Sequence, residues 1–143
     1  MKRVYNIILA ILMVFMIGVG ANAQQKFVVI ANNDVPVDQV NKSLLKRIYN
    51  GFMTQWNGGG KIKPCYTEVG GGEFWLYIGT SQVNFNKFWT KRVFSGNGVS
   101  PIEHKTDAEV IKYVNNISGA IGVISVSGKS KIGDSSKELS LSN

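Results

Sequence analysis

The fold class of this 143-residue chain follows most directly from one apolar run, Ala120-Ile-Gly-Val-Ile-Ser-Val126, which comes directly after Ser118-Gly119. Apolar residues fill nearly every position of the run, whereas a strand with one face in water alternates apolar and polar residues. A continuous apolar run of this length is typical of a strand in the middle of a sheet. We therefore expect Ala120–Val126 to be a central strand that is covered on both faces.

The chain before this run alternates between strand and helix patterns. The β-branched run Lys26–Ala31 and the alternating stretch Lys61–Val69 predict two further strands. Between them, Asn41 or Ser43 is the expected N-cap of a helix that ends at Asn50-Gly51.

Three more helices and one short strand are expected after Val69. Glu73–Ile78 predicts a short apolar helix, and a second helix begins at Ser81 and ends before Ser95-Gly-Asn-Gly98. Ile102–Lys105 predicts a short strand, and Thr106-Asp-Ala-Glu109 has the spacing of a capping box at the start of the last helix. Strands that alternate with helices define the α/β class.

The first 23 residues have the features of a secretory signal peptide. Lys2 and Arg3 form a basic start, Ile7–Val19 is apolar apart from Gly18, and Ala21-Asn-Ala23 has the small-x-small pattern of a cleavage site. An uncleaved membrane anchor is the alternative, but a core of this length extends about 20 Å at about 1.5 Å per residue, against a hydrocarbon layer of about 30 Å. We expect residues 1–23 to be cleaved and the protein to be periplasmic or secreted.

Removal of this segment leaves one modestly basic domain, residues 24–143. The whole chain carries 16 Lys and Arg against 9 Asp and Glu, and without Lys2 and Arg3 the formal charge falls from +7 to +5. That charge is spread along the chain without a basic stripe, so we expect no nucleic-acid partner. Residues 127–143 are expected to be a polar tail with an edge strand at Glu138–Ser142.

Few residues have the chemistry of a catalytic or metal site. The chain has one histidine, His104, and one cysteine, Cys65, and neither lies beside further metal-ligating residues at the usual spacing. We expect Cys65 to be a small core residue and His104 to lie at the surface. The acidic residues are scattered, so we predict no enzyme, no metal site and no cofactor.

One glycine triplet is the candidate ligand-binding site. Gly70-Gly71-Gly72 lies between a predicted strand and the helix expected to start at Glu73. Free backbone N–H groups and the helix dipole favour an anion at such a position. The alternative is a tight turn that binds no ligand. The candidate ligand-binding residues are Gly70, Gly71, Gly72 and Glu73.

Six aromatic residues follow this triplet at helical spacing. We expect them to be core residues, and the alternative is the lining of a carbohydrate or hydrophobic pocket. They are Phe74, Trp75, Tyr77, Phe85, Phe88 and Trp89.

Three motifs, in the same order along the chain, resemble those of phosphate-type periplasmic substrate-binding proteins. The first is Asn41-Lys-Ser-Leu-Leu-Lys-Arg-Ile-Tyr-Asn-Gly-Phe-Met-Thr-Gln-Trp56. The second runs from Phe88-Trp89 through Val93-Phe-Ser-Gly96 to Pro101. The third combines Asp107-Ala-Glu-Val-Ile111 with Gly119-Ala-Ile-Gly122. The resemblance runs from about residue 26 to residue 126.

This resemblance implies one lobe of a type II periplasmic-binding-protein fold, with a mixed sheet flanked by helices. Family members hold phosphate between two lobes and deliver it to an ABC permease. Phosphate-binding members carry an Arg and an Asp-Gly-Ser-Gly-Thr-like segment at a helix start, to which Glu68-Val-Gly-Gly-Gly-Glu73 corresponds here.

Two functional hypotheses follow from the resemblance. In the first, the protein binds phosphate or a related oxyanion as a single lobe or as a homodimer, with an ABC permease or another membrane protein as partner. In the second, it is a ligand-free periplasmic interaction module that kept the fold and lost the site.

Overall fold

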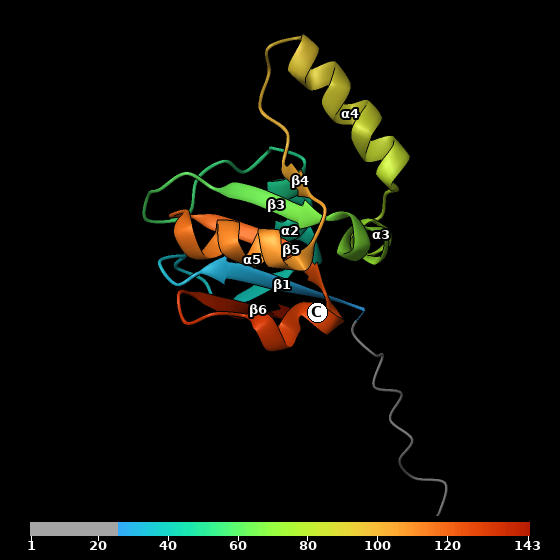
Figure 1. Ribbon diagram of the computed structural model, residues 1–143. Helices are drawn as coiled ribbons and strands as arrows, with labels where there is room; N and C mark the ends of the chain where they lie inside the picture. The colour runs from blue at the N-terminus through green and yellow to red at the C-terminus, as the bar shows by residue number, and fades with distance from the viewer. Residues whose placement is uncertain (1–25) are drawn as a thin grey trace, which may run out of the picture.

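The computed structural model describes residues 26–143, so the predicted signal peptide lies outside the described residues. A mixed six-stranded sheet with strand order β2-β6-β1-β5-β3-β4 forms its centre (Figure 1). The strands are β1 (Phe27–Asn32), β2 (Gln39–Asn41), β3 (Lys63–Thr67), β4 (Ile102–His104), β5 (Ala120–Ser125) and β6 (Ser136–Ser142). The helices are α2 (Lys42–Tyr49), α3 (Glu68–Tyr77), α4 (Gln82–Phe94), α5 (Asp107–Asn116) and the 3₁₀-helix η1 (Val126–Lys131).

The predicted α/β class and the central position of Ala120–Val126 are confirmed. Strand β5 lies between β1 and β3 and is antiparallel to the first and parallel to the second. Ile121 and Val123 belong to the core under α2 and α3, whereas Ala120 and Ile124 belong to a separate core under α5. Helices therefore cover both faces of this strand, as its continuous apolar sequence requires.

A glycine in β5 sets the distance to α5. A Cβ atom at Gly122 would lie 2.6 Å from Val110 Cγ1 and 3.0 Å from Val114 Cγ2. Because real Cβ atoms do not approach that closely, only glycine at this position lets α5 pack directly on the sheet.

The strand predicted at Glu138–Ser142 is present, but its position in the sheet and the structure before it differ from the prediction. Val126–Lys131 forms η1, and the last strand begins at Ser136 and lies between β1 and β2 instead of at an edge. The edge position is taken by β2, a three-residue strand that no sequence pattern indicated. Leu139 is fully buried at the centre of β6. One fully buried leucine in Ser136-Lys-Glu-Leu-Ser-Leu-Ser142 is too weak a pattern to indicate an inner strand.

The prediction for Cys65 is confirmed. The residue is fully buried in β3 and lies in the core under α5. Burial raises the pKa of the Cys65 thiol to about 12 because the thiolate would lose its hydration. At neutral pH the side chain is therefore a neutral apolar group with no nucleophilic character.

We expect Leu139→Ala to lower the free energy of unfolding by about 2–5 kcal/mol, since it removes a fully buried side chain from an inner strand. Urea unfolding followed by circular dichroism measures the change. The matched control is Leu76→Ala, because Leu76 is 68% exposed and its truncation costs less than about 0.5 kcal/mol. Equal effects of the two substitutions would contradict an inner position for β6.

We expect the Cys65 thiol to resist Ellman's reagent in the native protein at pH 8 and to react fully in guanidinium chloride. Because the unfolded thiol ionises near pH 8.5 and the native thiol near 12, the free energy of unfolding should fall as the pH rises above about 8.5. In Cys65→Ala this contribution to the pH dependence is absent. Labelling of the native protein at the rate of the denatured protein would contradict the burial.

Candidate functional site

The carboxyl ends of three parallel strands meet at one edge of the sheet. Strand β3 is parallel to both β4 and β5, so Thr67, His104 and Ser125 lie at the same end. Helix α3 begins directly after the first of these residues, α5 begins three residues after the second, and η1 begins directly after the third. In open α/β sheets this edge is where ligands bind.

The expected start of the first of these helices is wrong. Helix α3 begins at Glu68, five residues before the predicted Glu73, and β3 ends at Thr67 instead of Val69. The Thr67 hydroxyl oxygen accepts a hydrogen bond from the Gly70 N–H at 2.9 Å and so caps the helix. Three consecutive glycines cost about 3 kcal/mol relative to alanine in a helix, and burial of Phe74 and Trp75 on the same helix offsets that cost.

The glycines of this helix differ sharply in what surrounds them. A Cβ at Gly70 would lie 2.7 Å from the carbonyl carbon of Ile124 and 2.9 Å from the Ser125 nitrogen. The first turn of α3 thus rests directly on the backbone at the end of β5. A Cβ at Gly71 would meet the Trp75 ring nitrogen at 3.0 Å, whereas Gly72 faces open space.

This placement changes which backbone groups are free to bind an anion. In an α-helix the N–H groups from the fourth helical residue onward bond to carbonyls one turn back, which applies to Gly71, Gly72 and Glu73. Gly70 bonds to the Thr67 hydroxyl. The N–H groups of Glu68 and Val69 have no intrahelical acceptor, and they are the free donors of this turn.

Two carboxylates lie on the same helix as these donors. Glu68 is the first helical residue, where a negative charge interacts favourably with the helix dipole. Glu73 lies one and a half turns further on, and its carboxylate oxygen is 3.5 Å from Lys26 Nζ. Both members of that ion pair are largely exposed, so it contributes little to stability.

At the start of α5, on the same edge, the side chain of the first helical residue binds the end of β5. The Asp107 carboxylate accepts hydrogen bonds from the backbone N–H of Ser125 at 3.0 Å and from the Ser125 hydroxyl. A Cβ at Gly128 of η1 would lie 2.6 Å from Asp107 Oδ2, so η1 covers this carboxylate. Sequence reasoning assigned Asp107 only to a capping box and missed the bond to β5, because that contact spans 18 residues.

The prediction that His104 lies freely at the surface is wrong. His104 is half-buried in β4, its ring centroid is 5.4 Å from that of Tyr113, and its Nε2 atom is buried without a hydrogen-bond partner. Within residues 26–143, no group of three or more His, Cys, Asp or Glu side chains is arranged to hold a metal ion. No helix in that range is long and apolar enough to span a bilayer.

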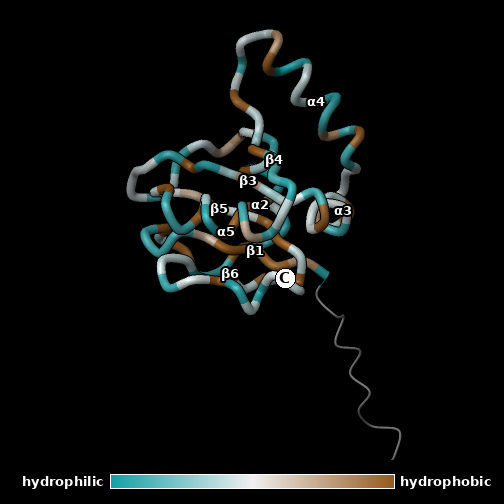
Figure 2. Tube along the Cα trace, in the orientation of Figure 1, coloured by the Kyte–Doolittle hydropathy of each residue, from teal (hydrophilic) through white to brown (hydrophobic). Residues whose placement is uncertain are grey.

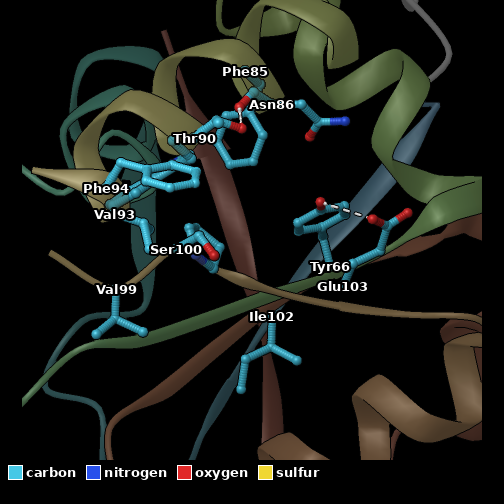
Figure 3. Close-up of a pocket in the computed structure, with 12 residues that line it drawn as sticks. Tyr66, Phe85, Asn86, Thr90, Val93, Phe94, Val99, Ser100, Ile102 and Glu103 are labelled. Carbon is cyan, nitrogen blue, oxygen red and sulfur yellow. Dashed lines mark hydrogen bonds between the residues drawn. The ribbon is translucent and has the colours of Figure 1, made fainter.

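A second feature of the structure is a hollow between α4 and β4, with a volume of about 750 Å³ (Figure 3). Its deepest lining residues are the buried aromatic side chains of Tyr66, Phe85 and Trp89. The Trp89 ring N–H donates to the Tyr49 carbonyl oxygen at 3.0 Å and so ties α4 to the end of α2.

The prediction that the aromatic stripe belongs to the core is confirmed. Phe74, Trp75, Phe85 and Trp89 are buried, and Tyr77 and Phe88 are partly buried against the same core. The Trp75 and Phe85 rings stack with centroids 4.1 Å apart, which joins α3 to α4. Phe85 and Trp89 also line the hollow.

The sequence matches no known protein-family model and no curated protein. Solved structures, by contrast, share its fold. A phosphate ABC transporter substrate-binding protein from Clostridium perfringens, solved with bound phosphate, matches with a TM-score of 0.60 and 20% identity over 81% of this chain and 44% of its own. A possible phosphate-binding protein from Planctomyces limnophilus matches with a TM-score of 0.61 and 11% identity over 82% and 42%. An ABC-type phosphate transport receptor from Vibrio cholerae matches with a TM-score of 0.52 and 19% identity over 81% and 46%.

These likenesses confirm the predicted resemblance at the level of the fold. The mixed sheet flanked by helices is that of the phosphate-type periplasmic substrate-binding proteins. The chain spans less than half the length of each of these structures, as one lobe does.

We expect Gly70→Ala to lower the free energy of unfolding by about 1–3 kcal/mol, because the added methyl group overlaps the backbone at the end of β5. Gly72→Ala is the matched control in the same helix. Its methyl group meets nothing within 4 Å, and the better helix propensity of alanine should raise the free energy of unfolding by about 0.5–1 kcal/mol. Chemical denaturation of both variants measures the difference, and destabilisation of equal size would contradict the close packing of α3 on β5.

Proposed function

We propose that this protein is an exported solute-binding lobe that binds phosphate or a related oxyanion at the first turn of α3. The observation that carries the proposal is the position of this turn, at the carboxyl ends of parallel strands in a fold shared with phosphate-binding proteins. The N–H groups of Glu68 and Val69 are free to donate to the oxyanion, and the helix dipole adds to their effect.

Each predicted site residue has a definite role in this proposal. Gly70 keeps the helix start against β5, and the absence of a side chain at Gly72 leaves room for the ligand beside the helix. The absence of a side chain at Gly71 leaves space for the Trp75 ring. Glu73 lies at the margin of the proposed site, and its ion pair with Lys26 partly offsets its negative charge.

The carboxylates limit how tightly such a site binds. Glu68 belongs to the same turn as the two donors, and a carboxylate about 5 Å from a phosphate dianion raises its free energy by about 1 kcal/mol or more at the protein surface. We therefore propose weak binding by the single lobe. In a homodimer, a second copy would supply the opposite side of the cleft. Delivery to an ABC permease, after export directed by residues 1–23, completes this proposed role.

The second candidate function is a ligand-free periplasmic interaction module. The observation that favours it is the intramolecular carboxylate at the α5 start, where Asp107 holds the donors at the end of β5. The negative charge of Glu68 likewise interacts favourably with the positive end of the α3 dipole. A protein that needs no ligand has no need to keep either helix start open.

We expect calorimetric titration of the purified protein with inorganic phosphate to show weak binding that strengthens about tenfold in Glu68→Gln/Glu73→Gln. The reason is the loss of two like charges near the oxyanion. The matched control is Asp134→Asn, which also replaces a carboxylate by an amide. Asp134 lies in the turn before β6, away from α3, and its carbonyl accepts a hydrogen bond from Asn33, which follows β1.

The control variant should bind phosphate as the wild type does. Sedimentation of the same samples with and without phosphate distinguishes a single lobe from a homodimer. Absence of heat for wild type and the Glu68→Gln/Glu73→Gln variant at millimolar phosphate would exclude the first function and leave the interaction module.

A further inference from the structure

We infer that the hollow between α4 and β4 binds an extended segment of a partner protein that carries both apolar and acidic side chains. This inference goes beyond the proposed oxyanion function and does not depend on it. It rests on three properties of the hollow: its exposed apolar rim, its position at a sheet edge, and the charge of the helix beside it.

The rim of the hollow consists of apolar side chains that the protein leaves in water. Phe94 and Val99 are 88% and 87% exposed, and Val93 and Ile102 are also exposed. All four line the same hollow, above the buried aromatic floor. Figure 2 shows these hydrophobic positions at the end of α4 and along its connection to β4. A cluster of large exposed apolar side chains around a concavity is typical of a protein-binding surface.

The sheet ends on one side of this hollow. Strand β4 pairs with β3 and is the last strand in the order of the sheet, so its other edge has no strand partner within residues 26–143. Helix α4 lies beyond β4, away from the rest of the sheet (Figure 1). An extended segment that enters from this side finds backbone groups of β4 to pair with and apolar side chains to cover.

The charge of the neighbouring surface selects an acidic segment. No Asp or Glu occurs from Phe74 to Ile102, whereas Lys87, Lys91 and Arg92 lie on α4. Arg92 already serves the fold, because its guanidinium lies 5.3–5.6 Å from the centroids of three aromatic rings. Lys87 and Lys91 are exposed, and among residues 26–143 neither lies within 4.0 Å of a carboxylate oxygen.

The two lysines line a depression that shares residues with the hollow. Asn86 and Thr90 line the hollow on one side, and together with Lys87, Lys91 and Val83 they line a shallower depression on the outer face of α4. A segment in the hollow therefore reaches both lysines by extending side chains over Asn86 and Thr90.

The acidic residue in the hollow fixes the orientation of that segment. Glu103 lies on the β4 side, where its carboxylate accepts from the Tyr66 hydroxyl at 3.2 Å (Figure 3). It also accepts from Gln82 Nε2 at 3.4 Å. It repels acidic side chains from the β4 side, so those of the partner are directed towards α4 and its lysines.

The shape of the surface favours a protein segment over an anionic bilayer. A helix that lies on a bilayer presents a projecting apolar face, whereas the apolar side chains here surround a concavity. The lining also contains Asn86, Thr90 and Ser100, whose polar groups a peptide backbone satisfies and a hydrocarbon layer does not.

The test is selection of a random library of peptides of about twelve residues, displayed on phage, against the purified full chain. We expect the enriched sequences to combine apolar with acidic residues. A synthetic peptide of the enriched sequence, labelled with fluorescein, should bind in an anisotropy titration, and Lys87→Glu/Lys91→Glu should weaken its binding about five- to tenfold. Phe94→Ser/Val99→Ser, which alters only exposed side chains, should weaken it by a similar factor.

The matched control is Lys42→Glu/Lys46→Glu on α2, which reverses two exposed lysines at the same spacing on another helix and should leave peptide binding unchanged. Three results would overturn the inference: no enrichment of peptides, an enriched sequence without acidic residues, or binding that survives both double substitutions at the hollow. Co-sedimentation with phosphatidylglycerol vesicles that Lys87→Glu/Lys91→Glu abolishes, without peptide binding, would instead assign the face to a membrane.

Discussion

The burial of β5 between two helical layers is the constraint on which the other contacts depend. Ile121 and Val123 contribute to one core and Ile124 to the other, and each such side chain stabilises the fold by about 1.5–3 kcal/mol when it leaves water. Two close approaches to the same strand follow from glycines. Gly122 admits α5 to one face, and Gly70 admits the first turn of α3 to the strand end. A larger residue at either position would separate a helix from the sheet.

Two helices, α3 and α5, begin at the same edge of the sheet, and their first residues make different contacts. At the start of α5, the Asp107 carboxylate bonds to Ser125 at the end of β5, and η1 covers that carboxylate. At α3 the Thr67 cap uses only the Gly70 donor, and the amides of Glu68 and Val69 remain free. At α3, the charge of Glu68 determines how strongly these two amides can bind an anion.

Helix α4 packs one side against the core and exposes another side at the surface. Phe85 and Trp89 hold it to the body through stacking on Trp75 and a hydrogen bond to the Tyr49 carbonyl. Its other side carries lysines, and its end carries exposed Phe94. One helix thus combines a stable anchor with an apolar and basic face, next to the unpartnered edge of β4.

The sequence alone determined the α/β class, the burial of Cys65 and the fold resemblance, because long apolar runs and helical spacing are local patterns. The sequence also indicated Asn41 or Ser43 as the cap of α2, and the structure selects Asn41, whose carboxamide oxygen accepts from Leu44 N–H at 2.8 Å. Only the tertiary structure decided the start of α3, the inner position of β6 and the bond from Asp107 to Ser125. Each of these depends on contacts between distant segments: Gly70 with Ile124, Leu139 with β1, and α5 with β5. Burial and backbone packing there outweigh the weak local preferences of glycine and serine.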